Sequence, residues 1–361
     1  MSIWRFAKHL HDTPASARLT LGEGGTPIVR SRRIGPAAGL SNLYLKLETV
    51  NPSGSYKDRF AAAAVSDMVA RGTKRCLATS SGNTGSALAA YCAAAGLPLR
   101  IAVVDGAPAG KLRQMQAYGA SLFSVRGFGN DPAVAEGVNA YLQRQVEAGD
   151  AMVQISAFKF SPIGMSGVQT IAYELIEQLP GGIDHVFCPA GGGGLTLATA
   201  RGFEVIRRAG ESELRPAVHV VQPEGNDTIA TPLREGADRA HAVHGTSTVS
   251  GLQVGWVIDG DQVIAACRAS GGSGHVVTDD TAYHLQARLA REEGVFCEPA
   301  GALALAGVLK AAKHGEIAAD AVTVCLVTGT GFKDEKSLAN MAGDDAMKTY
   351  ASAAEIEDQR S

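Results

Sequence analysis

The sequence lacks the features that would place this chain in a membrane, on nucleic acid or outside the cell. No stretch approaches the roughly 20 consecutive apolar residues that cross a bilayer, and the opening residues, MSIWRFAKHLHD, lack the apolar core of a secretory signal. The formal net charge is only -3, so neither nucleic acid nor an anionic membrane is expected as a partner. We therefore expect a cytoplasmic protein.

Paired cysteines are missing as well. The six cysteines are scattered without a CxxC spacing, so structural zinc is not expected and no metal site is predicted. Cys188 in HVFCPA and Cys325 in VTVCLVT lie in apolar, strand-like segments. Such surroundings are typical of cysteines that serve as small buried side chains in a reducing compartment.

The chain has enough apolar sequence for a large core and about two domains, since 45% of its 361 residues are hydrophobic and 19% are charged. We expect strands at 43–48, 76–81, 99–104, 121–125, 185–190, 217–222 and 322–328. We expect helices at 84–95, 108–118, 132–148, 164–179, 195–209, 280–293 and 300–312. Strands that alternate with helices predict an α/β fold with mainly parallel, twisted sheets flanked by helices.

The 43 glycines gather in short runs beside these segments. Four turns rich in glycine or hydroxyl groups are predicted to follow strands: SSGNTG (80–85), AGGGGL (190–195), SGGSG (270–274) and TGTGFKD (328–334). Open α/β sheets bind ligands at the carboxyl ends of their strands. The turns therefore predict a ligand site along such an edge.

The four consecutive glycines at 191–194 predict a phosphate site. Consecutive glycines let backbone N–H groups approach one anion, and the helix that follows adds the positive end of its dipole. A tight turn without a ligand, the alternative, usually needs fewer glycines. The run lacks both the GK[ST] of a P-loop and the GxGxxG of a dinucleotide fingerprint. We therefore expect the phosphate of some other ligand.

Two further features lie near predicted helix starts. The turn SSGNTG combines amides with hydroxyl groups, which suits a carboxylate, although a simple capped helix is the alternative. Lys57, in NPSGSYKDRFAAAAV, stands at the mouth of an alanine-rich helix, where the helix dipole disfavours a cation. A lysine at this position is therefore expected to have a specific function.

Six segments, in this order, carry a resemblance to a known family: LGEGGTPIVRS, LYLKLETVNPSGSYKDR, TSSGNTGSALAAY, PAGGGGL, CEPAGALALAG and LVTGTGFKD. They resemble fold-type-II pyridoxal-phosphate enzymes, the tryptophan synthase β-like fold, and within that group threonine synthase. The resemblance runs from about residue 20 to 335. It implies a homodimer and two domains, with a small domain at 50–158, a large domain at 1–49 and 159–343, and a polar tail at 344–361.

The resemblance also implies the cofactor contacts. Lys57 would carry pyridoxal phosphate as a Schiff base, which accounts for its position, because a desolvated amine near positive dipole ends has a lowered pKa and is nucleophilic when neutral. Thr328 would face the pyridine nitrogen with an uncharged hydroxyl, which suits elimination of a good leaving group. The remaining implied contacts are Asn83 to the phenolic oxygen and Gly191, Gly192, Gly193, Gly194 and the amide of Leu195 to the phosphate.

The substrate contacts follow from the same resemblance. Its α-carboxylate would meet the loop residues Ser80, Ser81, Gly82 and Thr84. In threonine synthases, a serine and an arginine after the fourth small-domain strand help to bind a second phosphate. Here Ser156 fits, but no arginine follows before Gly164, and Lys159 is the available cation. Leu195 stands where many threonine synthases have asparagine.

The resemblance therefore predicts a lyase that eliminates phosphate from O-phosphohomoserine and adds water to give threonine. One alternative is a serine/threonine dehydratase or a β-replacement enzyme acting on an O-phosphoserine-like substrate. Another is a catalytically silent amino-acid-binding protein, which would need neither Lys57, Asn83 nor Thr328. Glu298, in CEPAGA, is expected to cap the helix that starts near residue 300, and a role near the substrate is the alternative.

Overall fold

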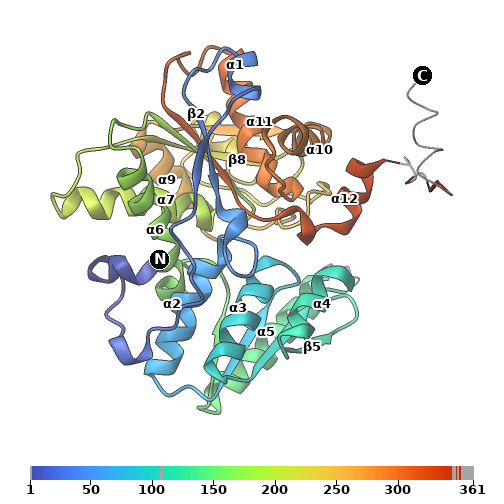
Figure 1. Cartoon of the computed structure of the whole chain (residues 1–361). Coiled ribbons are helices and arrows are strands. Elements are labelled where there is room, and N and C mark those ends of the chain that lie inside the picture. Colours follow the sequence, from blue (N-terminus) through green and yellow to red (C-terminus); the bar gives the residue numbers. More distant parts are fainter. Residues whose placement is uncertain are drawn as a thin grey trace.

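The computed structural model describes residues 2–105, 107, 109–129, 131–343, 347, 349 and 350. Its strands form two sheets, one of six strands in the order β1-β2-β10-β7-β8-β9 and one of four in the order β5-β4-β3-β6 (Figure 1). Within the described residues, neighbouring strands are parallel except for β1 and β2, which pair antiparallel. This is the predicted α/β fold class with parallel-rich sheets and flanking helices.

The strands are β1 (Ile28–Arg30), β2 (Leu43–Leu47), β3 (Arg75–Thr79), β4 (Leu99–Val103), β5 (Ser121–Ser124), β6 (Ala151–Gln154), β7 (His185–Pro189), β8 (Ala217–Pro223), β9 (Gly274–Val277) and β10 (Thr323–Val327). The α-helices are α1 (Ile34–Ala37), α2 (Lys57–Ala70), α3 (Asn83–Ala95), α4 (Ala109–Ala117), α5 (Pro132–Glu147), α6 (Pro162–Gln178), α7 (Gly194–Arg208), α8 (Ala230–Arg234), α9 (Gly260–Ser270), α10 (Asp279–Arg288), α11 (Pro299–Lys313) and α12 (Glu335–Ala342). Short 3-10 segments are η1 (Ile3–His9), η2 (Ala15–Ala17), η3 (Glu48–Val50) and η5 (Gly331–Lys333), and η4 (Leu289–Glu293) is a π-turn.

Every predicted strand and helix is present, with ends shifted by a residue or two, except that the helix predicted at 280–293 passes into the π-turn η4 after Arg288. Strands β1, β6 and β9 were not predicted, and they have only three or four residues each. Runs that short carry too little alternation to be recognised. The cysteines are unpaired and buried, as predicted.

One prediction about the turns is wrong. SGGSG (270–274) does not follow a strand, because Ser270 ends α9 and Gly271 terminates that helix with a φ of 80°. The turn leads into β9 and therefore lies at the opposite edge of the six-stranded sheet from AGGGGL and TGTGFKD, which follow β7 and β10. Gly272 serves close packing there, since a Cβ on it would lie 1.9 Å from the carbonyl oxygen of Val218.

Two helices join the parts of the molecule that carry the two sheets. In Figure 1, α3, α4, α5 and β5 lie in the lower part and β2, β8, α10 and α11 in the upper part. Helices α2 and α6 pack closely against each other, because a Cβ on Gly167 of α6 would lie only 2.2 Å from the carbonyl oxygen of Arg59 on α2. The domain boundaries at 50–158 stay a prediction, and the expected tail at 344–361 lies mostly outside the described residues. None of the described helices combines the length and apolarity needed to cross a membrane.

Candidate active site

Lys57 is the first residue of α2, and the Asp58 carboxylate holds the loop that leads to it. Asp58 accepts hydrogen bonds from the backbone N–H and hydroxyl of Ser53 and from the backbone N–H of Ser55. The loop is thereby folded back onto the first turn of the helix. This local arrangement fixes where the Lys57 side chain starts.

The surroundings of Lys57 make its amine weakly basic. Burial lowers the pKa of Lys57 to about 7, although the carboxylates of Asp259 and Glu298 act in the opposite direction. The side-chain nitrogen also lies 4.4 Å from the centroid of the Tyr56 ring. Near neutral pH a substantial share of this amine is uncharged, and an uncharged amine can act as a nucleophile or a base.

A hydrogen-bonded chain connects Lys57 to two other predicted site residues. Lys57 Nζ donates to Ser156 Oγ at 2.7 Å, and that hydroxyl lies 2.8 Å from Thr84 Oγ1. Ser156 follows β6, and Thr84 lies in the first turn of α3. Three segments that are distant in sequence therefore meet at one point, and a proton can pass along the chain that they form.

Asn83, the first residue of α3, contacts Glu298, whose expected capping hydrogen bond is not formed. Its Nδ2 donates to Glu298 Oε1 at 2.7 Å. Glu298 is buried and precedes α11, but its side chain makes no capping hydrogen bond to that helix. The carboxylate is directed across to Asn83 because Gly329 leaves it room: a Cβ on Gly329 would lie 2.3 Å from Glu298 Oε1.

Thr328 is buried at the carboxyl end of β10, next to the Lys57 loop. Its carbonyl oxygen accepts a hydrogen bond from the backbone N–H of Tyr56 at 3.0 Å. The neighbouring Gly329 forms an isolated bridge with Ser55. The turn TGTGFKD is therefore held against the residues that precede Lys57.

The glycine run forms the entry to α7 and is closely packed by neighbouring side chains. Gly193 adopts a φ of 89° and is the N-cap residue of α7. A Cβ would lie 3.1 Å from Val254 if placed on Gly191, 3.0 Å from Ile258 on Gly192, 2.6 Å from Val263 on Gly193 and 3.1 Å from Met165 on Gly194. Packing and backbone conformation therefore require glycine at Gly193, whereas a side chain at the other three positions would press on Val254, Ile258 or Met165. The N–H groups of the first turn of α7 remain available to an anion.

Two residues of the first turn of α7 add to this picture. The side chain of Leu195 is buried in the core, so only its backbone can face a ligand. Thr196 is fully buried, and its Oγ1 has no hydrogen-bond partner among the described residues. A buried hydroxyl without a partner beside a helix start suits a phosphate oxygen.

The two serine hydroxyl groups of SSGNTG already accept hydrogen bonds from backbone N–H groups. Ser80 Oγ accepts from the backbone N–H groups of Gly82 at 3.3 Å and Gly85 at 3.1 Å, and Ser81 Oγ accepts from the N–H of Val104 at 2.8 Å. For Ser80, the bond to Gly85 in the first turn of α3 supports the alternative interpretation, that of a capped helix, whereas Ser81 joins the loop to the residue after β4. Recognition of a carboxylate would fall to backbone amides of the loop and to Thr84.

Lys159 does not join the group formed by Lys57, Ser156 and Thr84. It is exposed, and its Nζ lies 5.5 Å from the centroid of the Phe160 ring. The cause is Asp259, a buried carboxylate that accepts from the backbone N–H groups of residues 158 and 159 at 2.8 and 3.0 Å. These two hydrogen bonds hold the loop so that Ser156 lies next to Lys57 and the Lys159 side chain faces solvent.

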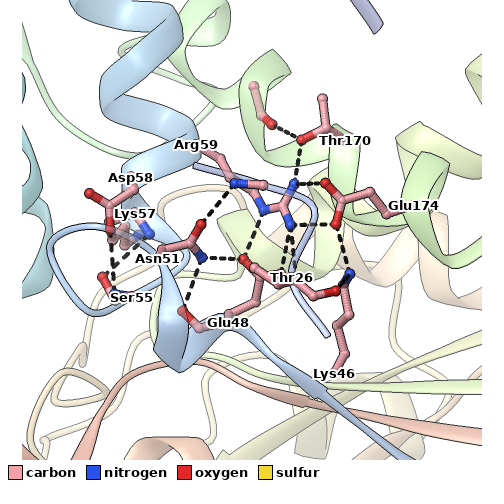
Figure 2. A network of polar contacts seen from close by, with 12 residues as sticks. Thr26, Lys46, Glu48, Asn51, Ser55, Lys57, Asp58, Arg59, Thr170 and Glu174 are labelled. Atoms are coloured by element: carbon pink, nitrogen blue, oxygen red, sulfur yellow. Dashed lines mark hydrogen bonds and ion pairs between the residues drawn. The ribbon is translucent and has the colours of Figure 1, made fainter. Parts of the chain in front are cut away.

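A buried ionic network supports α2 directly after Lys57 (Figure 2). The Arg59 guanidinium donates to Glu48 at 2.8 Å through both Nε and Nη2, and to Glu174 at 2.7 and 2.8 Å through Nη1 and Nη2. Lys46 Nζ donates to Glu174 at 2.7 Å. All four side chains are fully buried. Two cations and two anions balance, which is how charges can be buried without a large net cost.

The network also fixes the LGEGGTP segment. Thr26 Oγ1 donates to Glu48 at 2.6 Å, and the backbone N–H of Gly25 donates to Glu174 at 2.7 Å. Asn51, two residues before Ser53, donates to Glu48 at 2.8 Å and accepts from Gly24 at 3.0 Å. The polar residues of this motif and of NPSGSYKDR are thus explained in part by mutual hydrogen bonding. Sequence reasoning missed the network because its members are spread over five segments.

Comparison with known proteins agrees with this geometry. A family model described as pyridoxal-phosphate dependent enzyme matches residues 19–329. The chain belongs to this family. It is similar to two threonine synthases: that of Methanosarcina acetivorans, with 32% identity over 341 residues, 93% of this chain and 81% of that protein, and that of Mycobacterium leprae, with 33% identity over 321 residues, 88% and 84%. Among solved structures, maize serine racemase has the same fold, with a TM-score of 0.74 at 24% identity over 93% of this chain and 95% of that one.

This enzyme is therefore pyridoxal-phosphate dependent. The chemistry of its candidate site residues also suits this cofactor. The glycine run with the unpartnered Thr196 hydroxyl suits the phosphate. Lys57, with a pKa of about 7, suits the aldehyde. Which individual residues contact the cofactor stays a prediction.

Proposed function

We propose that this enzyme is a lyase that removes a leaving group from an amino-acid substrate, and that Lys57 is its catalytic base. The observation that supports this most directly is the Lys57 amine, half-buried, with a pKa of about 7 and hydrogen-bonded to Ser156. A base with a pKa close to the working pH is well matched to accepting and returning a proton. Pyridoxal phosphate, when bound, supplies an electron sink for charge at the substrate α-carbon.

The protein residues would act as follows. The first turn of α7 and the run Gly191 to Gly194 would hold the cofactor phosphate, with Asn83 and Thr328 beside its ring. Backbone amides of residues 80–84 would bind the substrate α-carboxylate. Lys57 would remove the α-proton, and the hydroxyl groups of Ser156 and Thr84 would provide a route by which that proton leaves or reaches the substrate. A homodimer in the cytoplasm completes the proposal, as the resemblance implies.

For the substrate, we infer O-phosphohomoserine, with release of phosphate and addition of water to give threonine. The support is the similarity to threonine synthases over most of the chain at 32% and 33% identity. The TGTGFKD turn beside Lys57 is a further feature that the resemblance associates with those enzymes.

A second candidate, a serine/threonine dehydratase or β-replacement enzyme, is favoured by the charges around Ser156. Lys159 is exposed, and Arg201 stacks 4.2 Å from the Phe158 ring and donates to Gln262 at 2.5 Å. At Gly164 a Cβ would lie 2.5 Å from the Phe60 ring, so an arginine cannot be accommodated there. Among the described side chains, none offers Ser156 the bidentate guanidinium that suits a phosphate.

Product analysis separates these candidates. The purified enzyme is supplied separately with O-phosphohomoserine, O-phosphoserine, threonine and serine, and release of phosphate and formation of 2-oxo acid are measured. Threonine and phosphate from O-phosphohomoserine support the first candidate. Ammonia and a 2-oxo acid from serine or threonine alone support the second. No turnover with bound cofactor would leave the silent binding protein as the function.

A further inference from the structure

We propose that Gln222 is a positioning residue that sets the orientation of the glycine run toward the cofactor phosphate. Gln222 lies near the end of β8 and is fully buried. Its Nε2 donates to the carbonyl oxygen of Gly191 at 3.0 Å. This inference rests on the proposed function in one respect, namely that the anion bound at the glycine run is the phosphate of pyridoxal phosphate.

Every polar atom of the Gln222 side chain is used. Nε2 also donates to Thr228 Oγ1 at 3.2 Å, while Oε1 accepts from the backbone N–H groups of Ile229 and Ala230, each at 2.8 Å. These bonds fix the plane of the amide and determine which of its two terminal atoms is the oxygen and which is the nitrogen. The amide therefore joins the first glycine of the run to the start of α8.

The same contacts shape the run from a second direction. Ile229, which Gln222 holds by its backbone, packs so closely on Gly193 that a Cβ there would lie 2.9 Å from Ile229 Cδ1. Gly193 has the positive φ on which the entry to α7 depends. Gln222 thus restrains the peptide at Gly191 directly and the peptide at Gly193 through Ile229. Because a peptide is planar, fixing the carbonyl of Gly191 also fixes the direction of the next N–H.

The test uses Gln222→Glu, which has nearly the same shape but cannot donate when ionised. Cofactor is removed from the folded enzyme, and the dissociation constant for pyridoxal phosphate is measured from the absorbance band expected at about 410–420 nm. At pH 8.5 the carboxylate would face the carbonyl of Gly191, and we expect affinity at least about tenfold weaker than in the unsubstituted enzyme. At pH 6 the introduced carboxyl group could donate again once it is protonated. The ratio of the dissociation constant of the variant to that of the unsubstituted enzyme should therefore be closer to one at pH 6 than at pH 8.5.

The matched control is Gln169→Glu. Gln169 is a buried glutamine on α6 whose Oε1 accepts from the Tyr173 hydroxyl at 3.2 Å. This control carries the same change of charge in the interior but away from the glycine run. We expect its affinity for the cofactor to stay within about threefold of the unsubstituted enzyme at both pH values.

The outcomes separate the inference from the proposed function. If Gln222→Glu is folded and binds the cofactor within twofold of the unsubstituted enzyme at both pH values, the positioning role is wrong. If the unsubstituted enzyme shows no absorbance band, the phosphate site itself is wrong. Should Gln222→Glu not fold, Thr228→Val removes one partner of the amide, with Thr323→Val, another buried threonine, as its control. A severalfold loss of affinity in Thr228→Val alone then supports the role, and equal affinities refute it.

Discussion

At the scale of single residues, the chemistry depends on where burial places charge. The pKa of Lys57 would be 10.5 in water, but burial brings it to about 7. Asp259 opposes that shift and also pins the loop that carries Ser156. One carboxylate therefore influences both the charge and the hydrogen-bond partner of the proposed base.

We predict that Lys57→Ala lowers turnover by more than about 1,000-fold, because it removes the amine that is expected to attach the cofactor and move the proton. Borohydride reduction of the native enzyme followed by peptide mapping should place the cofactor on Lys57. The control is Lys74→Ala, an exposed lysine outside the candidate site, whose removal should change turnover less than twofold. Label recovered on any other lysine would contradict the assignment.

We predict that Asp259→Asn moves the acid limb of the pH profile of kcat/KM to lower pH. The negative charge of Asp259 raises the pKa of Lys57 against the effect of burial, so its loss lowers that pKa further. We also expect kcat to fall about tenfold, because an asparagine cannot accept from both N–H groups that Asp259 now holds. Asp279→Asn, which changes a carboxylate bonded to Ser247 and Thr248 instead, is the control and should leave the limb in place.

At the scale of elements, α2 is positioned by charge as well as by close packing. Burial alone would raise the pKa of Glu48 and Glu174, but the Arg59 guanidinium outweighs it and holds both pKa values below their usual range. Groups shifted in this direction stabilise the fold above about pH 4.5 and lose that effect as the pH falls. The network therefore ties α2, β2 and α6 together at neutral pH.

Arg59→Met should reduce the free energy of unfolding by about 3–5 kcal/mol at pH 7, since it leaves two buried carboxylates with Lys46 as their remaining cation in the network. Urea denaturation followed by circular dichroism measures the loss. Arg208→Met is the matched control, because Arg208 is 74% exposed and pairs with Glu204, which is itself 39% exposed, and such a surface pair contributes less than about 1 kcal/mol. Equal losses in the two variants would be inconsistent with a network that stabilises the fold.

Three neighbouring strands carry a row of histidines that the proposed function does not use. His219 Nδ1 accepts from the backbone N–H of Ser273 at 3.1 Å, so its proton is on Nε2, 3.1 Å from His185 Nδ1. His275 Nε2 lies 3.2 Å from His219 Nδ1 and is the donor in that pair. Burial, with a further effect of the neighbouring histidines, lowers the pKa of His219 to about 3, and burial lowers that of His275 to about 4 despite the nearby Glu316.

These shifts predict an acid-sensitive fold. The unfolded histidines bind protons below about pH 6.5, whereas the folded ones do not until the pH is near 3 to 4, so stability falls as the pH drops through that window. Each buried histidine contributes up to about 1.4 kcal/mol per pH unit. His219→Gln should flatten the dependence of the unfolding free energy on pH between about 6.5 and 4.5. His241→Gln, at an exposed position, should not alter it.

At the scale of the whole molecule, the candidate site lies where the carboxyl ends of both sheets meet. Lys57, Ser156 and Thr84 come from α2, the loop after β6 and α3, while the glycine run and Thr328 follow β7 and β10. Parallel strands bring their following loops to one edge, which is why ligands bind there in open α/β sheets. A ligand at this edge contacts both parts of the molecule.

Binding of pyridoxal phosphate should therefore raise the midpoint temperature of unfolding by several degrees. A ligand present at about 100 times its dissociation constant stabilises a fold by about 2.7 kcal/mol. Differential scanning calorimetry of cofactor-free and reconstituted enzyme measures the shift, and inorganic phosphate at the same concentration is the control. Lys57→Ala should show a smaller shift, since only the phosphate contacts remain. An unchanged midpoint in the native enzyme would argue against a cofactor site that spans the two sheets.

The sequence by itself determined the α/β class and the order of most strands and helices, although α9 was not predicted. It also indicated Lys57 and the glycine-rich turns as the candidate site. It could do so because periodicity, helix starts and consecutive glycines are local properties of the chain. The short strand β6 escaped prediction, although it leads into Ser156, because four residues carry too little pattern.

Only the tertiary structure decided which side chains meet. Glu298 reaches Asn83, 215 residues away, and not its own helix, because Gly329 leaves it room. Ser80 bonds within its loop and Ser81 bonds to Val104, while Lys159 faces solvent because Asp259 holds the backbone beside it. Such pairings depend on the registers of two sheets and on the packing of α2 against α6, and these are properties of the whole fold that no short stretch of sequence contains.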